Sequence, residues 1–280
     1  MLRLAAACGG FALGLVLAGA AGPSRAVMAH PDESPLIGAL AKLEKFPIPQ
    51  RRVGFVSPLP ISDTVPYMFY GAFRDRVMLV QESLQLRGYD VASARAALRN
   101  LDHALTGMKT HGVELIVIGG SVLSFAYDRA ALLERLREAS HKLGVPVTTD
   151  MEATVQMMQR AGVHKLAVAH RLNGLDDKAL TDYLVAAGFT VEGIVGPQLV
   201  IATRAGSATD EDSAFALTGE AAGQMHPRAD GILFLGGSTI NYPYLSVIQR
   251  TTGKPVFNNT MAFLDYVDSW LTANPRKRVP

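Results

Sequence analysis

Cysteine is almost absent from this sequence, because Cys8 is the only one among 280 residues. Cys8 also lies in an N-terminal stretch that we expect to be removed, which would leave no thiol in the remaining chain. Such a chain cannot form a disulfide, a cysteine-ligated metal site or a thiolate nucleophile. Its stability must come from a hydrophobic core, for which about 250 residues are sufficient.

Several other signatures of chemistry are missing as well. The histidines, at positions 30, 103, 111, 141, 164, 170 and 226, never occur with His-x-His or His-x-x-x-His spacing, so no metal site is predicted. Neither a Gly-x-Ser-x-Gly elbow nor a Gly-x-x-x-x-Gly-Lys phosphate loop occurs. Removing Arg3 and Arg25 with the N-terminal stretch lowers the 27 Lys and Arg to 25, equal to the 25 Asp and Glu. This neutral balance predicts no nucleic-acid partner.

The first 29 residues have the pattern of a secretory signal peptide. Arg3 precedes an uncharged apolar run from Leu4 to Ala21, and small residues then lead to Ala29, where a signal peptidase would cut. We therefore expect an exported, periplasmic protein with no membrane attachment after cleavage. A retained membrane anchor is the competing interpretation of the same run.

Strands and helices alternate from residue 51 onward, which is typical of parallel sheets covered by helices. The predicted fold class is α/β, with two similar lobes related by a pseudo-twofold axis and a cleft between them. We expect a signal peptide at 1–29, a lead-in segment at 30–50, lobe one at 51–148 with a closing helix at 256–272, lobe two at 149–255 and a tail at 273–280.

The two halves repeat one another in order. Each has an apolar strand that runs into Gly-Gly-Ser, at 119–121 and 236–238, followed by a helix, a glycine and an X-Pro-Val strand. This shared order predicts duplication into two lobes and would match Gly119 with Gly236. Within lobe one the pattern also predicts a helix at 73–87, an edge strand at 89–91 matching one at 189–191, and a helix at 94–111.

Parallel α/β sheets bind ligands beyond the carboxyl ends of their strands. Glycines there let main-chain N–H groups approach an anion, and serines add hydroxyl donors. Two such loops facing each other could hold a small carboxylate or both ends of a dicarboxylate. The alternative is that the glycines only permit tight turns. The expected binding residues are Ser57, Pro58, Gly119, Gly120, Ser121, Gly236, Gly237 and Ser238.

Five stretches carry a resemblance: GFVSP (54–58), GGSVLSF (119–125), LGVPVTT (143–149), ADGILFLGGS (229–238) and TGKPV (252–256). With them the chain resembles the aspartate/glutamate racemase superfamily, in particular the branch of arylmalonate decarboxylase and maleate cis-trans isomerase, from about residue 52 to 271. The resemblance implies two flavodoxin-like lobes with the site between them and no metal or organic cofactor. It also implies an enolate-like species stabilised by main-chain and hydroxyl donors.

The residues that would carry the family's chemistry are changed. The family's cysteine positions map to Gly120 in the first lobe, where the decarboxylase also has glycine, and to Gly236 in the second. The decarboxylase's Thr-Ser pair maps to Ser121 and Val122, and a family tyrosine maps near Leu172. The thiols, one hydroxyl and the tyrosine are therefore lost on a scaffold that is otherwise retained.

Two functions follow from this pattern. The first is a protein that binds a small carboxylate without the cysteine chemistry; the second is an active decarboxylase or isomerase with another acid/base. His170, at the end of a strand, is the candidate for that role, or else a plain polar strand end. Asp150 could be its partner or cap the next helix, and Asn258 and Asn259 could line the cleft or cap the last helix. The ligand and the oligomeric state stay open, a homo-oligomer included.

Overall fold

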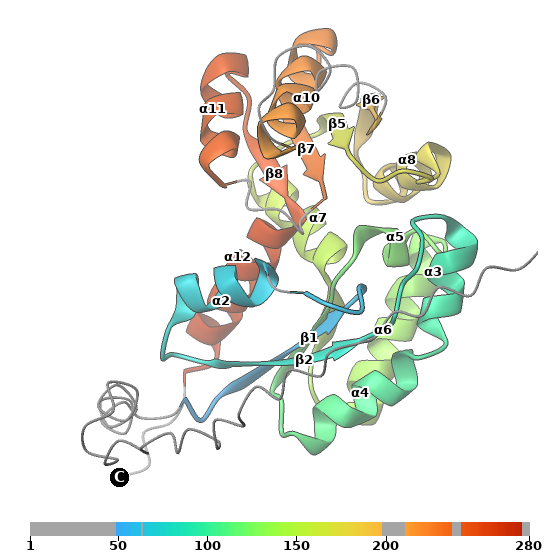
Figure 1. The fold of residues 1–280 in the computed structure, drawn as a ribbon, viewed down its shortest axis with the longest axis vertical. Coiled ribbons are helices and arrows are strands. Elements are labelled where there is room, and N and C mark those ends of the chain that lie inside the picture. Colours follow the sequence, from blue (N-terminus) through green and yellow to red (C-terminus); the bar gives the residue numbers. More distant parts are fainter. Residues whose placement is uncertain (1–48, 63, 198–210, 237–241, 276–280) are drawn as a thin grey trace, which may run out of the picture. The chain divides into compact units, whose positions relative to one another are not determined.

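The computed structural model describes residues 49–62, 64–197, 211–236 and 242–275. Within these residues it contains two four-stranded parallel sheets flanked by helices (Figure 1), as the sequence predicts. In this part of the chain no helix is long and apolar enough to cross a membrane. The expected signal peptide, nearly all of the lead-in segment, most of the tail, Gly237 and Ser238 lie outside the described residues.

The first sheet has the strand order β2-β1-β3-β4, and all of its pairs are parallel. Its strands are β1 (Arg52–Ser57), β2 (Met78–Ser83), β3 (Leu115–Ile118) and β4 (Val147–Thr149). The helices of this half are α2 (Thr64–Phe73), α3 (Val91–Leu98), α4 (Leu101–Thr110), α5 (Ser121–Ser124), α6 (Arg129–Leu143) and α7 (Asp150–Arg160).

The second sheet has the corresponding order β6-β5-β7-β8, again with parallel pairs only. Its strands are β5 (Lys165–His170), β6 (Thr190–Val195), β7 (Gly231–Leu235) and β8 (Val256–Asn258). Its described helices are α8 (Asp177–Ala186), α10 (Glu211–Met225), α11 (Tyr242–Thr252) and α12 (Asn259–Ala273). The two halves are therefore similar lobes, as the repeat predicts.

The strand register decides which residues of the two lobes correspond. β1 and β5 each begin with an exposed basic residue followed by five buried ones, which makes Arg52 the counterpart of Lys165. Pairing along β3 and β7 then equates Gly120 with Gly236. The match of Gly119 with Gly236 expected from the repeat was therefore wrong by one residue. Pairing along β4 and β8 likewise equates Asp150 with Asn259.

Three elements of the first lobe differ from their predictions. The middle of the predicted helix at 73–87 is the edge strand β2, which pairs in parallel with β1. The predicted strand at 89–91 is instead the start of α3, where the Asp90 carboxylate accepts the Ser93 N–H at 2.8 Å and caps the helix. The predicted helix at 94–111 is two helices, α3 and α4. The Leu and Gln content of β2 favours a helix locally, but pairing with β1 overrides that preference.

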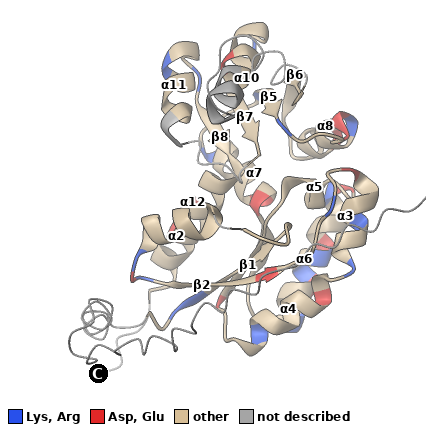
Figure 2. Ribbon diagram, in the orientation of Figure 1, with Lys and Arg blue, Asp and Glu red and all other residues tan. Residues whose placement is uncertain are grey.

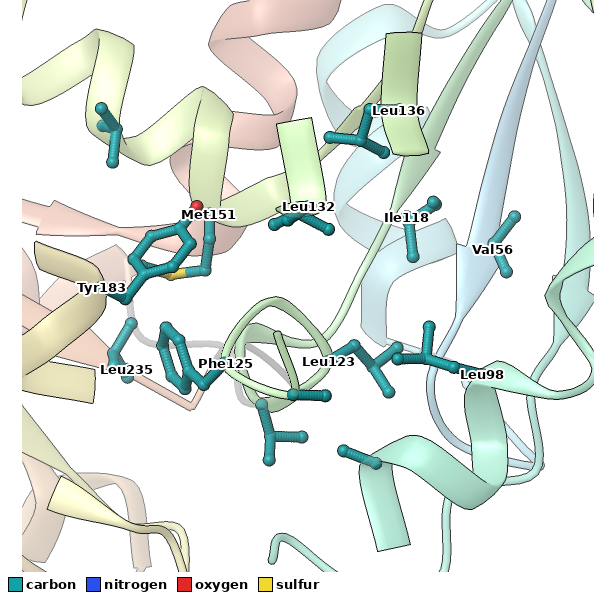
Figure 3. Close-up of a cluster of buried hydrophobic side chains, with 14 of the residues drawn as sticks. Val56, Leu98, Ile118, Leu123, Phe125, Leu132, Leu136, Met151, Tyr183 and Leu235 are labelled. Carbon is teal, nitrogen blue, oxygen red and sulfur yellow. The ribbon is translucent and has the colours of Figure 1, made fainter. Parts of the chain in front are cut away.

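The largest hydrophobic cluster joins the two lobes. Figure 3 shows Met151 of α7, Phe125 after α5, Tyr183 of α8 and Leu235 of β7 lying together, and all four belong to this cluster. The Phe125 and Tyr183 rings meet edge to face, with centroids 5.2 Å apart. A second cluster packs the last helix, α12, through Phe263 and its neighbours against the first sheet. Both α7 and α12 therefore pack against a hydrophobic cluster within their first two turns.

Candidate functional site

A cavity of about 70 Å³ lies at the carboxyl ends of the strands of both sheets. Its wall comes from the segments after β1, β3, β4, β5, β7 and β8, with part of α2 and the segment between β2 and α3. Most of the wall is apolar, and polar groups gather where the helices begin. The lining residues are Phe55, Ser57, Pro58, Leu59, Ser62, Val65, Leu86, Tyr89, Gly120, Ser121, Val122, Asp150, Leu172, Gly236, Asn259, Thr260 and Phe263.

Two long helices begin at this cavity. Asp150 is the first residue of α7 and Asn259 the first of α12, and both line the wall. The Thr149 hydroxyl caps α7 by accepting the Glu152 N–H at 3.0 Å, and the Asn258 amide oxygen caps α12 by accepting the Thr260 N–H at 2.9 Å. The positive ends of two helix dipoles therefore meet at the cavity, which favours negative charge there.

Asp150 is the central polar group of the cavity. Its side chain is buried, and Oδ2 accepts the Gly120 N–H and the Asn259 amide N–H, each at 2.8 Å. Oδ1 of Asp150 and Oδ1 of Asn259 are both buried and have no hydrogen-bond partner within the described part of the chain. Since the strand register makes these two residues counterparts, the bond between them joins the two lobes at equivalent positions.

Burial raises the pKa of Asp150 to about 6, although the bonds from Asn259 and the Gly120 N–H, together with the adjacent Met151 main chain, oppose the shift. A carboxyl with such a pKa exchanges its proton close to neutral pH. Figure 2 shows acidic colour on the first turn of α7, which carries Asp150 and Glu152. The described lining residues include no Lys, Arg or His, so Asp150 has no cationic partner in the wall.

Glu152, two residues further along α7, is neutralised by a separate network. Both of its oxygens accept bonds from the Arg129 guanidinium at 2.8 Å, and the Tyr183 hydroxyl donates to Oε1 at 2.5 Å. The Glu152 side chain is 6% exposed. Burial and the neighbouring Glu152 hold the pKa of Tyr183 well above its usual value, so that its hydroxyl stays protonated. The network ties α6, α7 and α8 together beside the cavity.

Five of the predicted binding residues line the cavity: Ser57, Pro58, Gly120, Ser121 and Gly236. Gly119 is not in the wall, and Gly237 and Ser238 lie outside the described residues. The Ser57 hydroxyl donates to the Leu59 carbonyl at 3.1 Å, so its proton is already used. The structure therefore brings residues of both glycine loops to one cavity.

The two glycines of the first loop do not offer their N–H groups to a ligand. The Gly119 N–H donates to the Val56 carbonyl at 2.9 Å, and the Gly120 N–H donates to Asp150. A Cβ on Gly119 would come within 2.3 Å of the Phe55 ring, so packing alone requires that glycine. Gly120 has a φ of 95°, which favours glycine there. In this loop the anion that the glycine contacts is the protein's own Asp150.

His170, the candidate acid/base, is not among the residues that line the cavity. It is buried at the end of β5, and its Nε2 lies 2.9 Å from Asp177 Oδ1 at the start of α8. Burial lowers the pKa of His170, although the nearby Asp177 opposes the shift, so the ring is mainly neutral at pH 7. Its partner is Asp177 and not Asp150, whose contacts are Gly120 and Asn259.

Leu86 and Tyr89 line the cavity and are not among the residues expected from the sequence, whereas Asn259 lines it as one of the two alternatives stated for that residue. Leu86 and Tyr89 reach the wall because residues 78–83 form a strand and the chain then turns beside the cavity. Asp150 and Asn259 follow β4 and β8, so their positions at strand ends are a signal in the sequence. Their mutual contact spans 109 residues and has no local signature. No group of three or more metal-binding side chains occurs among the residues the structure describes.

The comparisons with known proteins agree with this fold. The family model for arylmalonate decarboxylase matches residues 53–274. Unliganded arylmalonate decarboxylase is similar in structure, with a TM-score of 0.65, 18% identity, and coverage of 81% of this chain and 94% of that one. The maleate isomerase Iso from Pseudomonas putida S16 gives a TM-score of 0.63 at 15% identity, covering 80% of this chain and 92% of that one.

A second maleate cis-trans isomerase, from Nocardia farcinica and bound to TRIS, gives a TM-score of 0.62 at 14% identity, with 79% and 92% covered. No curated protein matches the chain significantly by sequence. At these identities the structural neighbours establish the fold, whereas the family model spans both sheets and the whole described cavity. The chain belongs to the arylmalonate decarboxylase family.

Proposed function

We propose that this protein binds a small carboxylic acid in the cavity between its two sheets, without the cysteine chemistry of its family. The observation that carries the proposal is that α7 and α12, one following each sheet, both begin at this cavity. Their dipoles favour an anionic group, and the apolar wall suits a short hydrocarbon body. Residues 1–29 would place this binding activity in the periplasm.

Gly120 and Gly236 support the absence of thiol chemistry. The sheet register makes them counterparts, and they are the positions onto which the resemblance places the family's two cysteines. A glycine carries no side chain that could exchange a proton. Any acid/base chemistry in this cavity must therefore come from another group.

A second candidate function is a cofactor-independent decarboxylase or isomerase that uses such a group. Asp150 favours this alternative more than His170 does, because it lines the cavity and burial raises its pKa to about 6. Incubation with malonate, maleate and phenylmalonate in deuterated buffer, followed by NMR, tests for proton exchange and turnover. Turnover that is lost in Asp150→Asn but kept in His170→Ala would favour this enzyme over a binding protein.

The binding function is tested by NMR titration and thermal shift with butyrate, malonate, maleate and phenylacetate. At least one of these should raise the melting temperature in proportion to the logarithm of its concentration. The substitution Ser62→Trp places an indole in the cavity wall and should weaken that binding by more than about tenfold. Its neighbour Ile61 is 83% exposed and does not line the cavity, so Ile61→Trp is the matched control.

The two tryptophan variants separate site binding from binding elsewhere. Equal affinities in Ser62→Trp and Ile61→Trp would place the ligand outside the cavity and contradict the proposal. The same holds if none of the four carboxylates stabilises the unchanged protein.

A further inference from the structure

We propose that a carboxylate bound in this cavity shares one proton with Asp150, so that binding takes up a proton at neutral pH. The inference rests on the proposed function and names the group that the ligand's carboxylate meets. It makes Asp150 a binding residue whose protonation state selects the ligand.

Only one oxygen of Asp150, Oδ1, has no hydrogen-bond donor among the described residues. Oδ2 already accepts two N–H bonds at 2.8 Å, from Gly120 and from Asn259. Oδ1 is buried and has no partner within the described ranges, in a side chain that is 3% exposed and lines the cavity. A buried oxygen in this state costs free energy until a donor reaches it. A proton placed between Oδ1 and a ligand oxygen supplies that donor.

No Lys, Arg or His is among the described residues that line the cavity, and the Arg171 side chain lies behind that wall, against Gly236. On α7 itself, Glu152 is held by Arg129 of α6 and the Tyr183 hydroxyl of α8, so this charge pair is complete. Tyr89 contributes a phenol from the segment after β2. The lining residues after β1, β3 and β8 are not titratable. Two ionised carboxylates in contact repel strongly, so one of them must hold a proton.

The helix dipoles favour a carboxylate that shares a proton with Asp150 over a positively charged ligand. An ammonium group would pair with ionised Asp150, but it would face the positive ends of both α7 and α12. A carboxylate with protonated Asp150 leaves one negative charge at those ends. Burial already disfavours ionised Asp150 in the empty cavity, so the proton is taken up readily.

The binding step is balanced by one proton from solvent. Above about pH 6 the ligand arrives as an anion, Asp150 gains a proton, and an O–H···O bond forms between the two carboxyls. No covalent bond forms or breaks in the ligand. The apparent Kd should therefore rise roughly tenfold for each pH unit above about 6, with close to one proton taken up per ligand at pH 7.5.

The test compares butyrate with butyramide, which has the same shape and no charge. Each is titrated into the whole protein by NMR between pH 5.5 and 8.0, where butyrate remains ionised. Calorimetry in two buffers with different ionisation enthalpies then counts the protons taken up. Butyrate affinity should fall roughly fiftyfold from pH 6 to pH 8, whereas butyramide affinity should not fall.

Asp150→Asn provides a second measurement. Its amide oxygen can accept the bonds from Gly120 and Asn259, and its NH₂ group donates where the shared proton would lie. The variant should bind butyrate with an affinity that is independent of pH and with no proton uptake. Glu134→Gln, at a solvent-exposed position of α6, removes one negative charge elsewhere and should keep the wild-type pH dependence.

The outcomes separate this inference from the proposed function. If butyrate binds in the cavity with the same affinity from pH 6 to pH 8, Asp150 does not share a proton, although the carboxylate function stands. If butylamine binds more tightly than butyrate and gains affinity as pH rises, Asp150 recognises a cation and the inference is overturned. If neither butyrate nor butyramide binds at any pH, the inference and the binding of butyrate fail together.

Discussion

At the scale of single residues, Asp150 determines the electrostatics of the cavity. Its carboxyl holds the first glycine loop through the Gly120 N–H and holds α12 through Asn259. Burial of the Asp150 carboxyl also raises the free energy of its ionised form. A residue that organises the site in this way should leave a signature in the stability of the protein as well as in its ligand binding.

Asp150→Asn should stabilise the protein at pH 7.5 and change little at pH 4. Folding raises the pKa of Asp150 from an unfolded value near 3.8 to about 6. The full contribution of protonated Asp150 to the free energy of unfolding is therefore present below about pH 4, and it is lost as pH rises through 6. The loss is at most about 3 kcal/mol, and asparagine does not incur it. Urea denaturation at both pH values measures the difference, and a variant less stable at pH 7.5 would refute the assignment.

At the scale of elements, the Glu152 network joins three helices. Arg129 reaches Glu152 of α7 with two bonds at 2.8 Å and the Ala186 carbonyl at the end of α8 at 3.3 Å. The Arg129 side chain is 19% exposed, so most of this charge pair is shielded from water. Removing one partner of such a pair leaves the other charge buried and poorly satisfied.

Arg129→Met should therefore destabilise the fold by about 3 kcal/mol, because Glu152 would keep only the Tyr183 hydroxyl. The matched control is Arg137→Met, which breaks an exposed pair with Glu134 and should cost less than about 1 kcal/mol. Denaturant midpoints of the two variants provide the measurement. Losses of equal size would mean that burial does not distinguish the two pairs.

Elements with strong local signals were predictable, and those that depend on a neighbour were not. Helix α6 is closed by Gly144 with a φ of 70°, and its glycine stop is visible in the sequence. β2 contains Met, Leu, Gln and Glu, which favour a helix, and it forms a strand only because β1 offers an edge. The capping pair of Asp90 and Ser93 was the signal that α3 begins there.

At the scale of the whole molecule, one core couples the two lobes. The largest cluster includes Ile118 of the first sheet and Leu235 of the second, with Leu184 of α8 fully buried in it. Trp270, the only tryptophan, packs with the separate cluster of α12 and the first sheet, and the Arg51 guanidinium lies 4.4 Å from its ring centroid. Trp270 fluorescence therefore reports on a region distant in sequence from α8.

Unfolding should be a single transition in which Trp270 fluorescence and far-ultraviolet circular dichroism coincide. Leu184→Ala leaves a cavity in the shared cluster and should lower stability by about 2–4 kcal/mol when measured by either signal. Thermal and urea melts of both proteins test this. A fluorescence midpoint that stays fixed while the dichroism midpoint falls would show that the lobes unfold separately.

The sequence by itself determined the alternation of strands and helices, the duplicated order, the confinement of cysteine to position 8 and the strand ends at which a site would form. These are local properties, since periodicity, turn residues and composition are read along the chain. Only the tertiary structure decided that the Asp150 carboxylate accepts hydrogen bonds from the Gly120 N–H and from Asn259, which is 109 residues away in the sequence. It also decided that His170 pairs with Asp177, away from the cavity wall. Such contacts depend on how two sheets pack, because each hydrogen-bond donor takes whichever acceptor the packing brings within reach.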